Sequence, residues 1–171
     1  MSLLKAQLPK LTEAHDLSGF ICGAAEIDEW LQTQAWKAQH AGNAYVFVYE
    51  DQGAVLGFYA LATGGIEHAG SPRFVRKNAP DPAPILLLGR LGVDKRVKGR
   101  GIGWALLQDV LLRSAEISDQ VGFRALVIHC RDETARDFYM HQTPSFVASA
   151  TDPLHLFIAL KSLRAFANSG D

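Results

Sequence analysis

Three glycines alternate through a short turn between a long apolar segment and an amphipathic one. This turn constrains the fold more than any other part of the chain. It reads Lys-Gly-Arg-Gly-Ile-Gly over residues 98–103. Residues 85–93 before it are mostly apolar, which predicts a buried strand, and the apolar spacing after it predicts a helix over 102–117. A strand, a glycine-rich turn and a helix in succession are typical of layered α/β domains.

The same turn suggests what the chain binds. Glycine lets the backbone approach a ligand closely, and the following helix offers unpaired amides at its positive end. The turn therefore predicts a site for a phosphate or pyrophosphate, with Lys98 and Arg100 adding charge. A plain tight turn leading into a helix is the alternative.

Two other phosphate motifs fit less well. A P-loop requires Gly-Lys-Ser/Thr at the end of the loop, which is absent. A dinucleotide fingerprint requires a third glycine where this chain has Leu106. Acidic residues do follow the next strand, at Asp132 and Glu133, so the dinucleotide alternative is weakened and stays open.

The rest of the chain predicts a single α/β (α+β) domain over residues 1–171, with a mixed, mostly antiparallel sheet flanked by helices. The strand–turn–helix–strand unit predicts a right-handed crossover. Periodicity and turn residues predict a helix over 24–40, a hairpin of strands 44–50 and 55–63, an exposed irregular loop over 70–84, a strand over 123–129, a helix over 132–141 and a last strand over 154–160.

Charge is distributed unevenly along a chain whose net charge is only −1. Residues 1–70 hold three basic against eight acidic residues, whereas residues 73–100 hold eight basic against two acidic ones. The second window predicts one anion-attracting face.

Composition excludes several other classes. The 171 residues, 48% hydrophobic and 20% charged, are typical of a globular chain. Cys22 and Cys130 have neither redox nor zinc spacing, so we expect packed thiols, no disulfide framework and no metal site. No apolar run approaches the length of a membrane span. The sequence therefore predicts a soluble, cytoplasmic protein without membrane attachment.

The turn resembles the main cofactor-binding motif of the GNAT acetyltransferases, Gln/Arg-x-x-Gly-x-Gly/Ala, with Lys98 in the first position. Residues 88–94 resemble the bulged strand of that family. Residues 135–139 (Ala-Arg-Asp-Phe-Tyr) are similar to its late helix motif, and Phe146 fits the Gly-Phe pair after it, with Ser145 in place of glycine.

The resemblance implies acetyl-CoA as cosubstrate and transfer of its acetyl group to an amine. It implies that Tyr139 protonates the departing thiolate and that a backbone N–H near Leu91 polarises the thioester carbonyl. From the residues alone, Tyr139 also fits a core aromatic beside Phe138. The implied cofactor-binding residues are Leu91, Gly92, Val93, Lys98, Gly99, Arg100, Gly101, Ile102 and Gly103.

A second resemblance covers nearly the whole chain. Five segments are similar to the GNAT toxins of bacterial toxin–antitoxin pairs: residues 82–94, which carry a Pro-x-x-Leu-Gly-Arg-Leu-Ala-Val-Asp signature with Gly92 in place of alanine, and residues 20–23, 27–31, 57–62 and 151–154. This implies that the acceptor is the α-amine of aminoacyl-tRNA. It also implies a small ribbon-helix-helix antitoxin as partner and a homodimer.

Six basic residues of the positive window could bind the phosphates of a tRNA: Arg73, Arg76, Lys77, Arg90, Lys95 and Arg96. Against this, a pI near 6.6 is low for an RNA-binding protein, and residues 73–77 also fit a solvated loop. Two alternatives stay open: acetylation of a small amine or a protein amine, and a non-catalytic module that binds acyl-CoA.

Overall fold

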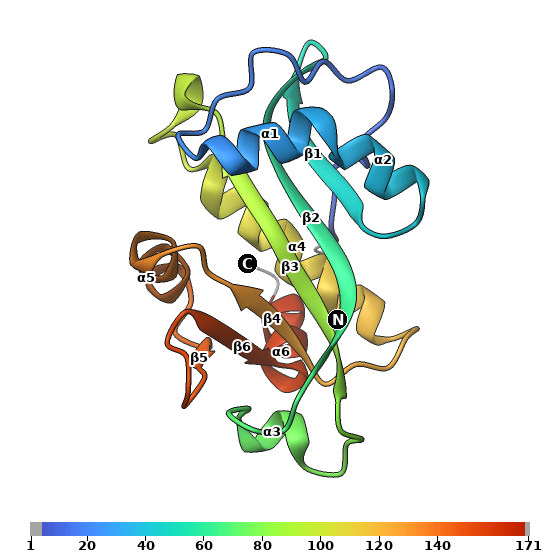
Figure 1. Cartoon of the computed structure of the whole chain (residues 1–171), viewed down its shortest axis with the longest axis vertical. Helices are drawn as coiled ribbons and strands as arrows, with labels where there is room; N and C mark the ends of the chain where they lie inside the picture. The colour runs from blue at the N-terminus through green and yellow to red at the C-terminus, as the bar shows by residue number, and fades with distance from the viewer. Residues whose placement is uncertain (1–4, 170–171) are drawn as a thin grey trace. The chain divides into compact units, whose positions relative to one another are not determined.

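The structure, a computed structural model, describes residues 5–169 and contains thirteen elements in these residues (Figure 1). In chain order they are α1 (Ala25–Thr33), α2 (Ala35–His40), β1 (Tyr45–Asp51), β2 (Ala54–Ile66), α3 (Arg73–Arg76), β3 (Ala83–Val93), the 3-10 helix η1 (Lys95–Val97), α4 (Ile102–Ser118), β4 (Ala125–His129), α5 (Glu133–Gln142), β5 (Val147–Ala148), β6 (His155–Ala159) and α6 (Leu160–Asn168).

Six strands form one mixed sheet in the order β1-β2-β3-β4-β6-β5. The pairs β1–β2, β4–β6 and β5–β6 are antiparallel, and β3–β4 is parallel. Because parallel neighbours need a crossover, α4 connects β3 to β4. The predicted mixed α/β sheet with flanking helices is confirmed.

The chain folds into two compact units that interleave along the sequence. Within the described residues, the glycine-loop unit comprises Ala6–Ala62 and Gly89–Val110, and the tyrosine unit comprises Lys5, Thr63–Leu88 and residues 111–169. A single domain over residues 1–171 stays a prediction. No helix within residues 5–169 is long and apolar enough to cross a membrane.

In the glycine-loop unit, β1 and β2 form the predicted hairpin. Gln52 and Gly53 form its turn with φ angles of 50° and 87°, as a two-residue turn of the I′ type requires. Alternate residues of a strand point to opposite sides, and residues 55–61 of β2 are all buried, so both faces of this part of the strand are covered. Phe58 packs with the cluster around α1 and α2, whereas the backbone at Gly57 lies against side chains of α4.

A segment before α1 is fastened to this unit by hydrogen bonds far apart in sequence. The carboxylate of Asp109 on α4 accepts from the backbone N–H groups of Gln7, at 2.7 Å, and Leu8, at 3.2 Å. It also accepts from the Tyr59 hydroxyl at 2.6 Å. Asp109 therefore ties this segment and β2 to α4.

In the tyrosine unit, β3 pairs with β4 only as far as Leu88 and Ile128. One face of the sheet carries a core cluster formed by Val75, Ala83, Ile85, Ala125, Val127 and Phe157. Helix α5 begins after Asp132, whose side chain accepts from the Ala135 N–H at 2.9 Å and so caps the helix.

Two expectations about the elements were wrong. The helix predicted over 24–40 is two helices separated at Gln34, whose φ of −119° is far from the usual helical value. The loop predicted over 70–84 contains the one-turn helix α3, which buries Val75. The last predicted strand is confirmed as β6, whereas helix α6, strand β5 and η1 were not predicted.

Gly92 should be harder to replace than Gly89 on the same strand. A methyl group at Gly92 would meet Ile27 at 3.2 Å, Phe58 at 3.3 Å and Phe20 at 3.4 Å. We expect Gly92→Ala to lower the free energy of unfolding by about 1 kcal/mol, although the toxins it resembles have alanine there. Gly89→Ala is the matched control: nothing lies within 4 Å of its added methyl group, so it should be neutral or stabilising. Equal urea midpoints for the two variants would contradict this account.

Candidate active site

The glycine turn forms an open loop in front of α4. Gly99 and Gly101 both have φ +79°, a left-handed conformation that other residues adopt only with strain, and nothing lies within 4 Å of a methyl group built on either. The Gly101 carbonyl accepts from the Ala105 N–H at 3.0 Å. As first residues of the helix, Ile102 and Gly103 have N–H groups without intrahelical partners. The loop therefore has the bare backbone and amides that fit a diphosphate.

The buried carboxylate of Asp94 holds this loop to the rest of its unit. Its Oδ1 accepts from the backbone N–H and the Nε of Arg96, both at 2.8 Å. Its Oδ2 accepts from Arg96 Nη2 at 3.0 Å and from the Ile21 N–H at 3.1 Å. Mainly because of the Arg96 guanidinium, the pKa of Asp94 falls from 3.8 to about 2, against the opposing effect of burial.

The ammonium of Lys98 also has an internal role. Its Nζ donates to the Cys22 carbonyl oxygen at 2.5 Å, and the Cys22 N–H donates to Asp28 at 2.8 Å. Lys98, predicted to bind the cofactor, thus fastens the loop to the segment before α1.

At the end of β3 the alternation of buried and exposed residues is broken. Gly89 and Arg90 are both exposed although they are consecutive, while Leu91 and Val93 are half-buried and Gly92 is buried. The Arg90 guanidinium lies over the Trp30 ring, 4.3 Å from its centre. Arg90 therefore has an aromatic partner on α1.

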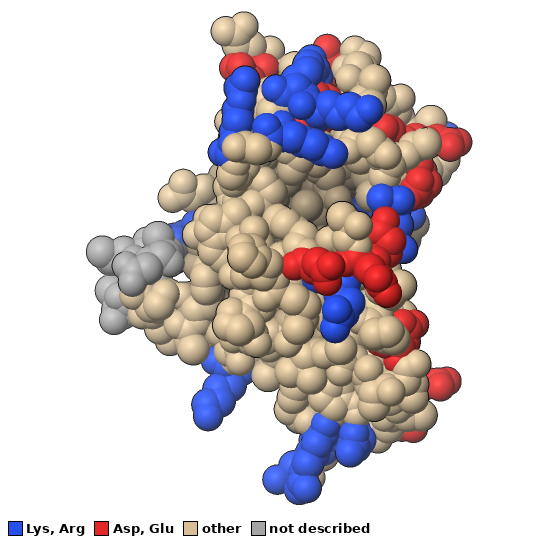
Figure 2. Space-filling model, turned by 90° about the vertical axis from the view of Figure 1, so that its left-hand side faces the viewer, with Lys and Arg blue, Asp and Glu red and all other residues tan. Residues whose placement is uncertain are grey.

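Basic side chains surround the loop. Lys95, Arg96, Lys98 and Arg100 are exposed, and Figure 2 shows Lys and Arg side chains gathered over this region at the top of the view. Arg96 is half-exposed despite its contact with Asp94. The anion-attracting character expected from the sequence is present at this loop.

Tyr139 lies in the tyrosine unit on α5, with its side chain buried. Its ring meets those of Phe138 and Phe146 edge-on, with centroids 5.2 Å and 6.1 Å away. Burial, with a smaller contribution from the nearby Cys130, raises the pKa of Tyr139 well above the ordinary tyrosine range. The phenol therefore keeps its proton at neutral pH and remains a hydrogen-bond donor.

Sequence reasoning missed a histidine pair beside Cys130. His129 and His155 are opposite each other on β4 and β6, and their rings stack with centroids 4.0 Å apart. His155 Nε2 lies 3.3 Å from a carboxylate oxygen of Asp152. Burial, and then His155, lowers the pKa of His129. Only the strand register, which pairs positions 26 residues apart, could have revealed this cluster.

The predicted basic residues of the loop before β3 also lie in the tyrosine unit. Arg73, Arg76 and Lys77 are exposed on and next to α3, and the Arg76 guanidinium donates to the Ser71 carbonyl. The predicted site residues are therefore divided: Tyr139 and this basic group belong to one unit, and the glycine loop with the end of β3 belongs to the other.

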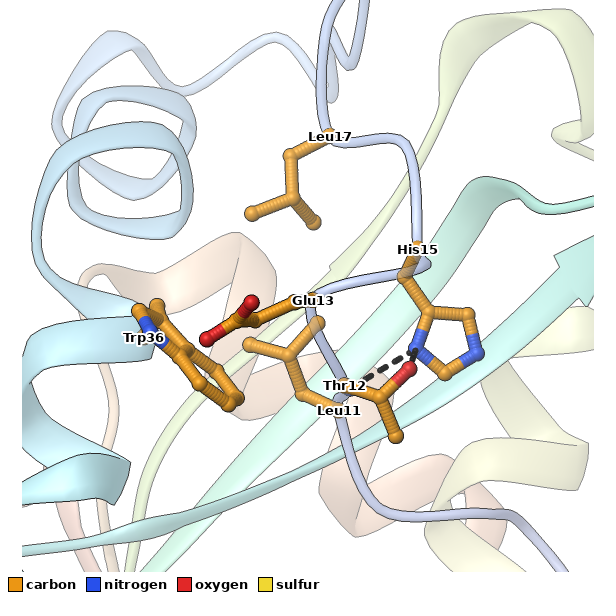
Figure 3. A pocket seen from close by; sticks show the side chains of 6 residues that line it. All are labelled: Leu11, Thr12, Glu13, His15, Leu17 and Trp36. Carbon is orange, nitrogen blue, oxygen red and sulfur yellow. Dashed lines mark hydrogen bonds between the residues drawn. The ribbon is translucent and has the colours of Figure 1, made fainter.

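A separate cavity of about 290 Å³ lies in the glycine-loop unit (Figure 3). Leu11, Leu17 and Trp36 supply apolar walls, and Glu13 lies beside the Trp36 ring. His15 accepts from the Thr12 N–H at 2.9 Å through Nδ1, so its imidazole is held in place. No predicted site residue lines this cavity.

A family model described as an acetyltransferase (GNAT) domain matches residues 42–142, more than half of the chain. The chain belongs to the GNAT acetyltransferase family. It is thus an N-acetyltransferase by family, and the family resemblance read from the glycine turn and the late helix is confirmed.

Two curated GNAT relatives cover most of the chain. A "tRNA-acetylating toxin" of Mycobacterium tuberculosis is 41% identical over 156 residues, which cover 91% of this chain and 93% of the relative. A "Probable toxin TacT" of Sinorhizobium fredii is 32% identical over 160 residues, which cover 88% of each chain.

Solved structures of similar fold include a mutant of KacT, with a TM-score of 0.81 and 26% identity over 93% of this chain and 97% of that one. The AtaTR complex bound to acetyl-CoA has a TM-score of 0.77 and 26% identity over 93% of this chain and 96% of that one. AtaT in complex with acetyl-methionyl-tRNA has a TM-score of 0.82; at 24% identity, it supports the GNAT fold alone.

The carboxylate of Asp94 should stabilise the protein in a pH-dependent way. Because its pKa falls from 3.8 to about 2 on folding, its charge contributes about 2 kcal/mol above pH ~5. That contribution declines as the pH falls through about 4 toward 2. We expect Asp94→Asn to lower the free energy of unfolding most at pH 7 and about half as much near pH 3, measured by urea unfolding. Asp51→Asn, at an exposed position, should have little effect at either pH. A deficit that stays constant with pH would show that the shape of Asp94, and not its charge, is what matters.

Proposed function

We propose that this chain is an acetyl-CoA-dependent N-acetyltransferase that acetylates the α-amine of aminoacyl-tRNA, and that it acts as a toxin by blocking translation. The observation that carries this proposal is the 41% identity, over nine-tenths of the chain, to a relative named as a tRNA-acetylating toxin. The open loop before α4 supports the cosubstrate, and the AtaTR complex provides a similar fold bound to acetyl-CoA.

In this proposal the diphosphate of acetyl-CoA binds the amides of Arg100, Gly101, Ile102 and Gly103. Gly99 and Gly101 support this because their left-handed backbone leaves bare space at the loop. Val93, Leu91 and Gly92 form the strand along which the pantetheine arm lies. Lys98 acts indirectly, through its bond to Cys22.

The reaction needs a polarised carbonyl and a proton for the departing sulfur. The backbone N–H near Leu91 polarises the thioester carbonyl. The acceptor nitrogen forms a bond to the acetyl carbon, the carbon–sulfur bond breaks, and the Tyr139 phenol gives its proton to the thiolate. The amine loses one proton to solvent, and solvent restores the phenol. Tyr139 suits the role because a phenol is protonated at neutral pH and can donate; its burial-raised pKa makes it a weak acid, so the proton moves only as charge develops on the sulfur.

The exposed basic residues support a polyanionic acceptor. Arg90, Lys95 and Arg96 lie by the glycine loop, and Arg73, Arg76 and Lys77 lie by α3. A small amine or a protein amine is the second candidate, favoured by the pI of about 6.6. We further propose a cytoplasmic location, a homodimer and a ribbon-helix-helix antitoxin as partner. A partner of the antitoxin class is supported by the two curated relatives, which are both named toxins; the complex of AtaT with the C-terminus of the antitoxin AtaR, at 22% identity, shares the fold alone.

The cofactor loop can be tested apart from catalysis. Gly101→Ala places a methyl group at the loop and strains a backbone with φ +79°. We expect affinity for acetyl-CoA to fall roughly tenfold or more in calorimetry. Gly53→Ala is the matched control in the same unit: its φ is +87° and its added methyl group also meets open space, but it lies in the hairpin turn. Equal losses of affinity in both variants would place the diphosphate elsewhere.

The function itself is tested by incubating the protein with labelled acetyl-CoA and charged tRNA, then with polyamines and peptides. We expect label on the aminoacyl group of the tRNA. Tyr139→Phe should lower turnover roughly 10²–10⁴-fold, with acetyl-CoA binding unchanged, because it removes only the donor. Tyr45→Phe, at an exposed position on β1, should keep wild-type turnover.

The two parts of this proposal fail in different ways. Label on small amines alone would end the tRNA proposal and keep the acetyltransferase. Full activity in Tyr139→Phe would remove that phenol from the mechanism and leave the acceptor standing.

A further inference from the structure

A second anion-attracting feature lies in the tyrosine unit, on the loop between β2 and β3. His68, Arg73, Arg76 and Lys77 line an open cavity of about 350 Å³ there. Figure 2 shows basic side chains gathered at the lower end of the view, where Figure 1 places α3. No carboxylate is among the lining residues.

The three basic side chains are not equivalent. The Arg76 guanidinium is hydrogen-bonded to the Ser71 carbonyl and closes the turn that precedes it. Arg73 and Lys77 are exposed, and neither side chain has a hydrogen bond or an ion pair with any other described residue. Arg73 is the first residue of α3 and Lys77 directly follows its last, and both line the cavity.

The turn that carries them is braced from β4. Arg124 lies at the start of that strand, and its guanidinium donates to three carbonyl oxygens at the end of α3: Val75 at 3.2 Å, Phe74 at 3.1 Å and Lys77 at 2.9 Å. The last carbonyls of a helix have no partner within it. Arg124 therefore supplies the partners that fix this short helix.

The other side of the loop is fixed in the same manner. The His68 N–H donates to Asp81 Oδ1 at 3.1 Å, and the His68 ring Nε2 lies 2.7 Å from the Pro80 carbonyl oxygen. The Ser71 hydroxyl donates to the Glu67 carbonyl at 2.6 Å. The Asp81 carboxylate thus accepts from a backbone amide beside the cavity.

This bracing distinguishes the cavity from a solvated basic loop. Val75 is completely buried in the core beneath the turn. A solvated loop needs no such anchoring, whereas a binding site gains affinity when its groups are ordered before the ligand arrives. Arg73 and Lys77 are the two side chains left to meet a ligand.

We propose that this cavity binds a backbone phosphate of the tRNA acceptor, with Arg73 and Lys77 in contact with the phosphate and with Arg76 and Arg124 as positioning residues. The proposal rests on the function proposed above, because it takes the RNA to be the substrate. A guanidinium fork and an ammonium together suit a phosphate group. Binding at this cavity thus distinguishes a tRNA acceptor from a small-amine acceptor, because of the two only the tRNA carries a phosphate.

The test combines Arg73→Ala with Lys77→Ala and measures binding of uncharged tRNA over a range of salt concentrations. We expect affinity to fall roughly 10- to 100-fold at low salt, and the slope of log affinity against log salt to fall by about 2. The KM for charged tRNA should rise in parallel. Acetyl-CoA affinity and kcat/KM for a polyamine, where one is accepted, should be unchanged.

Lys161→Ala is the matched control, because Lys161 is also exposed in the tyrosine unit, on α6. It removes one positive charge far in sequence from the cavity. Affinity for tRNA should stay within about twofold of wild type. An equal loss in this variant would mean that net charge, and not the cavity, attracts the RNA.

The positioning role is tested by Arg124→Met, which leaves Arg73 and Lys77 in place. We expect weaker tRNA binding with nearly the wild-type salt slope, because the contacting charges remain while their order is lost. Arg124→Lys, which keeps one donor, should restore part of the affinity. A salt slope as low as in the double variant would make Arg124 a phosphate contact and contradict its positioning role.

Failure of this proposal is distinct from failure of the proposed function. Normal acetylation and binding of tRNA by the double variant would overturn the cavity and keep the function. If the wild-type protein acetylates only small amines and the double variant still loses tRNA binding, the proposed cavity is retained and the proposed function is overturned. Thermal unfolding of each variant establishes that the fold is retained.

Discussion

The glycine loop depends on one buried carboxylate. Asp94 joins the segment before α1, the 3-10 helix and the approach to α4 through hydrogen bonds to Ile21 and Arg96. A loop made bare by glycines would otherwise be loose, because glycine has the largest conformational freedom to lose. The hydrogen bonds of Asp94 and the bond from Lys98 to the Cys22 carbonyl hold the loop in place through residues that lie outside it. The loop can then keep its amides and its open space for a ligand.

This division of roles also explains the positive window, which looks uniform in the sequence. In the structure, the basic side chains of this window contact different partners. Arg96 is committed to Asp94, Lys98 to Cys22, Arg76 to Ser71, and Arg90 to the Trp30 ring. Charges that hold backbone in place still attract anions, but they are less free to contact them directly. The net positive charge of the window therefore overstates the number of direct phosphate contacts, and this fits a chain whose overall charge is near zero.

Local patterns were enough to predict most of the architecture. Apolar periodicity placed the helix from Ile102 and the inward side chains Leu106 and Leu107, both fully buried. What it could not predict depends on distant partners. The bonds from Asp109 to Gln7 and Leu8 cross about a hundred residues, and carbonyls at the end of α3 are satisfied by the distant Arg124. The motifs likewise named Tyr139 and the glycines, whereas no pattern could indicate that Lys98 faces Cys22.

Tyr139 illustrates why a core role and a chemical role need not compete. Burial between Phe138 and Phe146, which makes it resemble a core aromatic, also raises the pKa of its phenol. A tyrosine of ordinary pKa already holds its proton at neutral pH, so burial is not what keeps the donor protonated, and the raised pKa makes the phenol a weaker acid. What an apolar surrounding provides is the exclusion of water, which would otherwise compete for the hydrogen bond of the phenol. The hydrophobic packing of α5 therefore fixes the position of the donor, and proton transfer depends on the charge that develops on the sulfur.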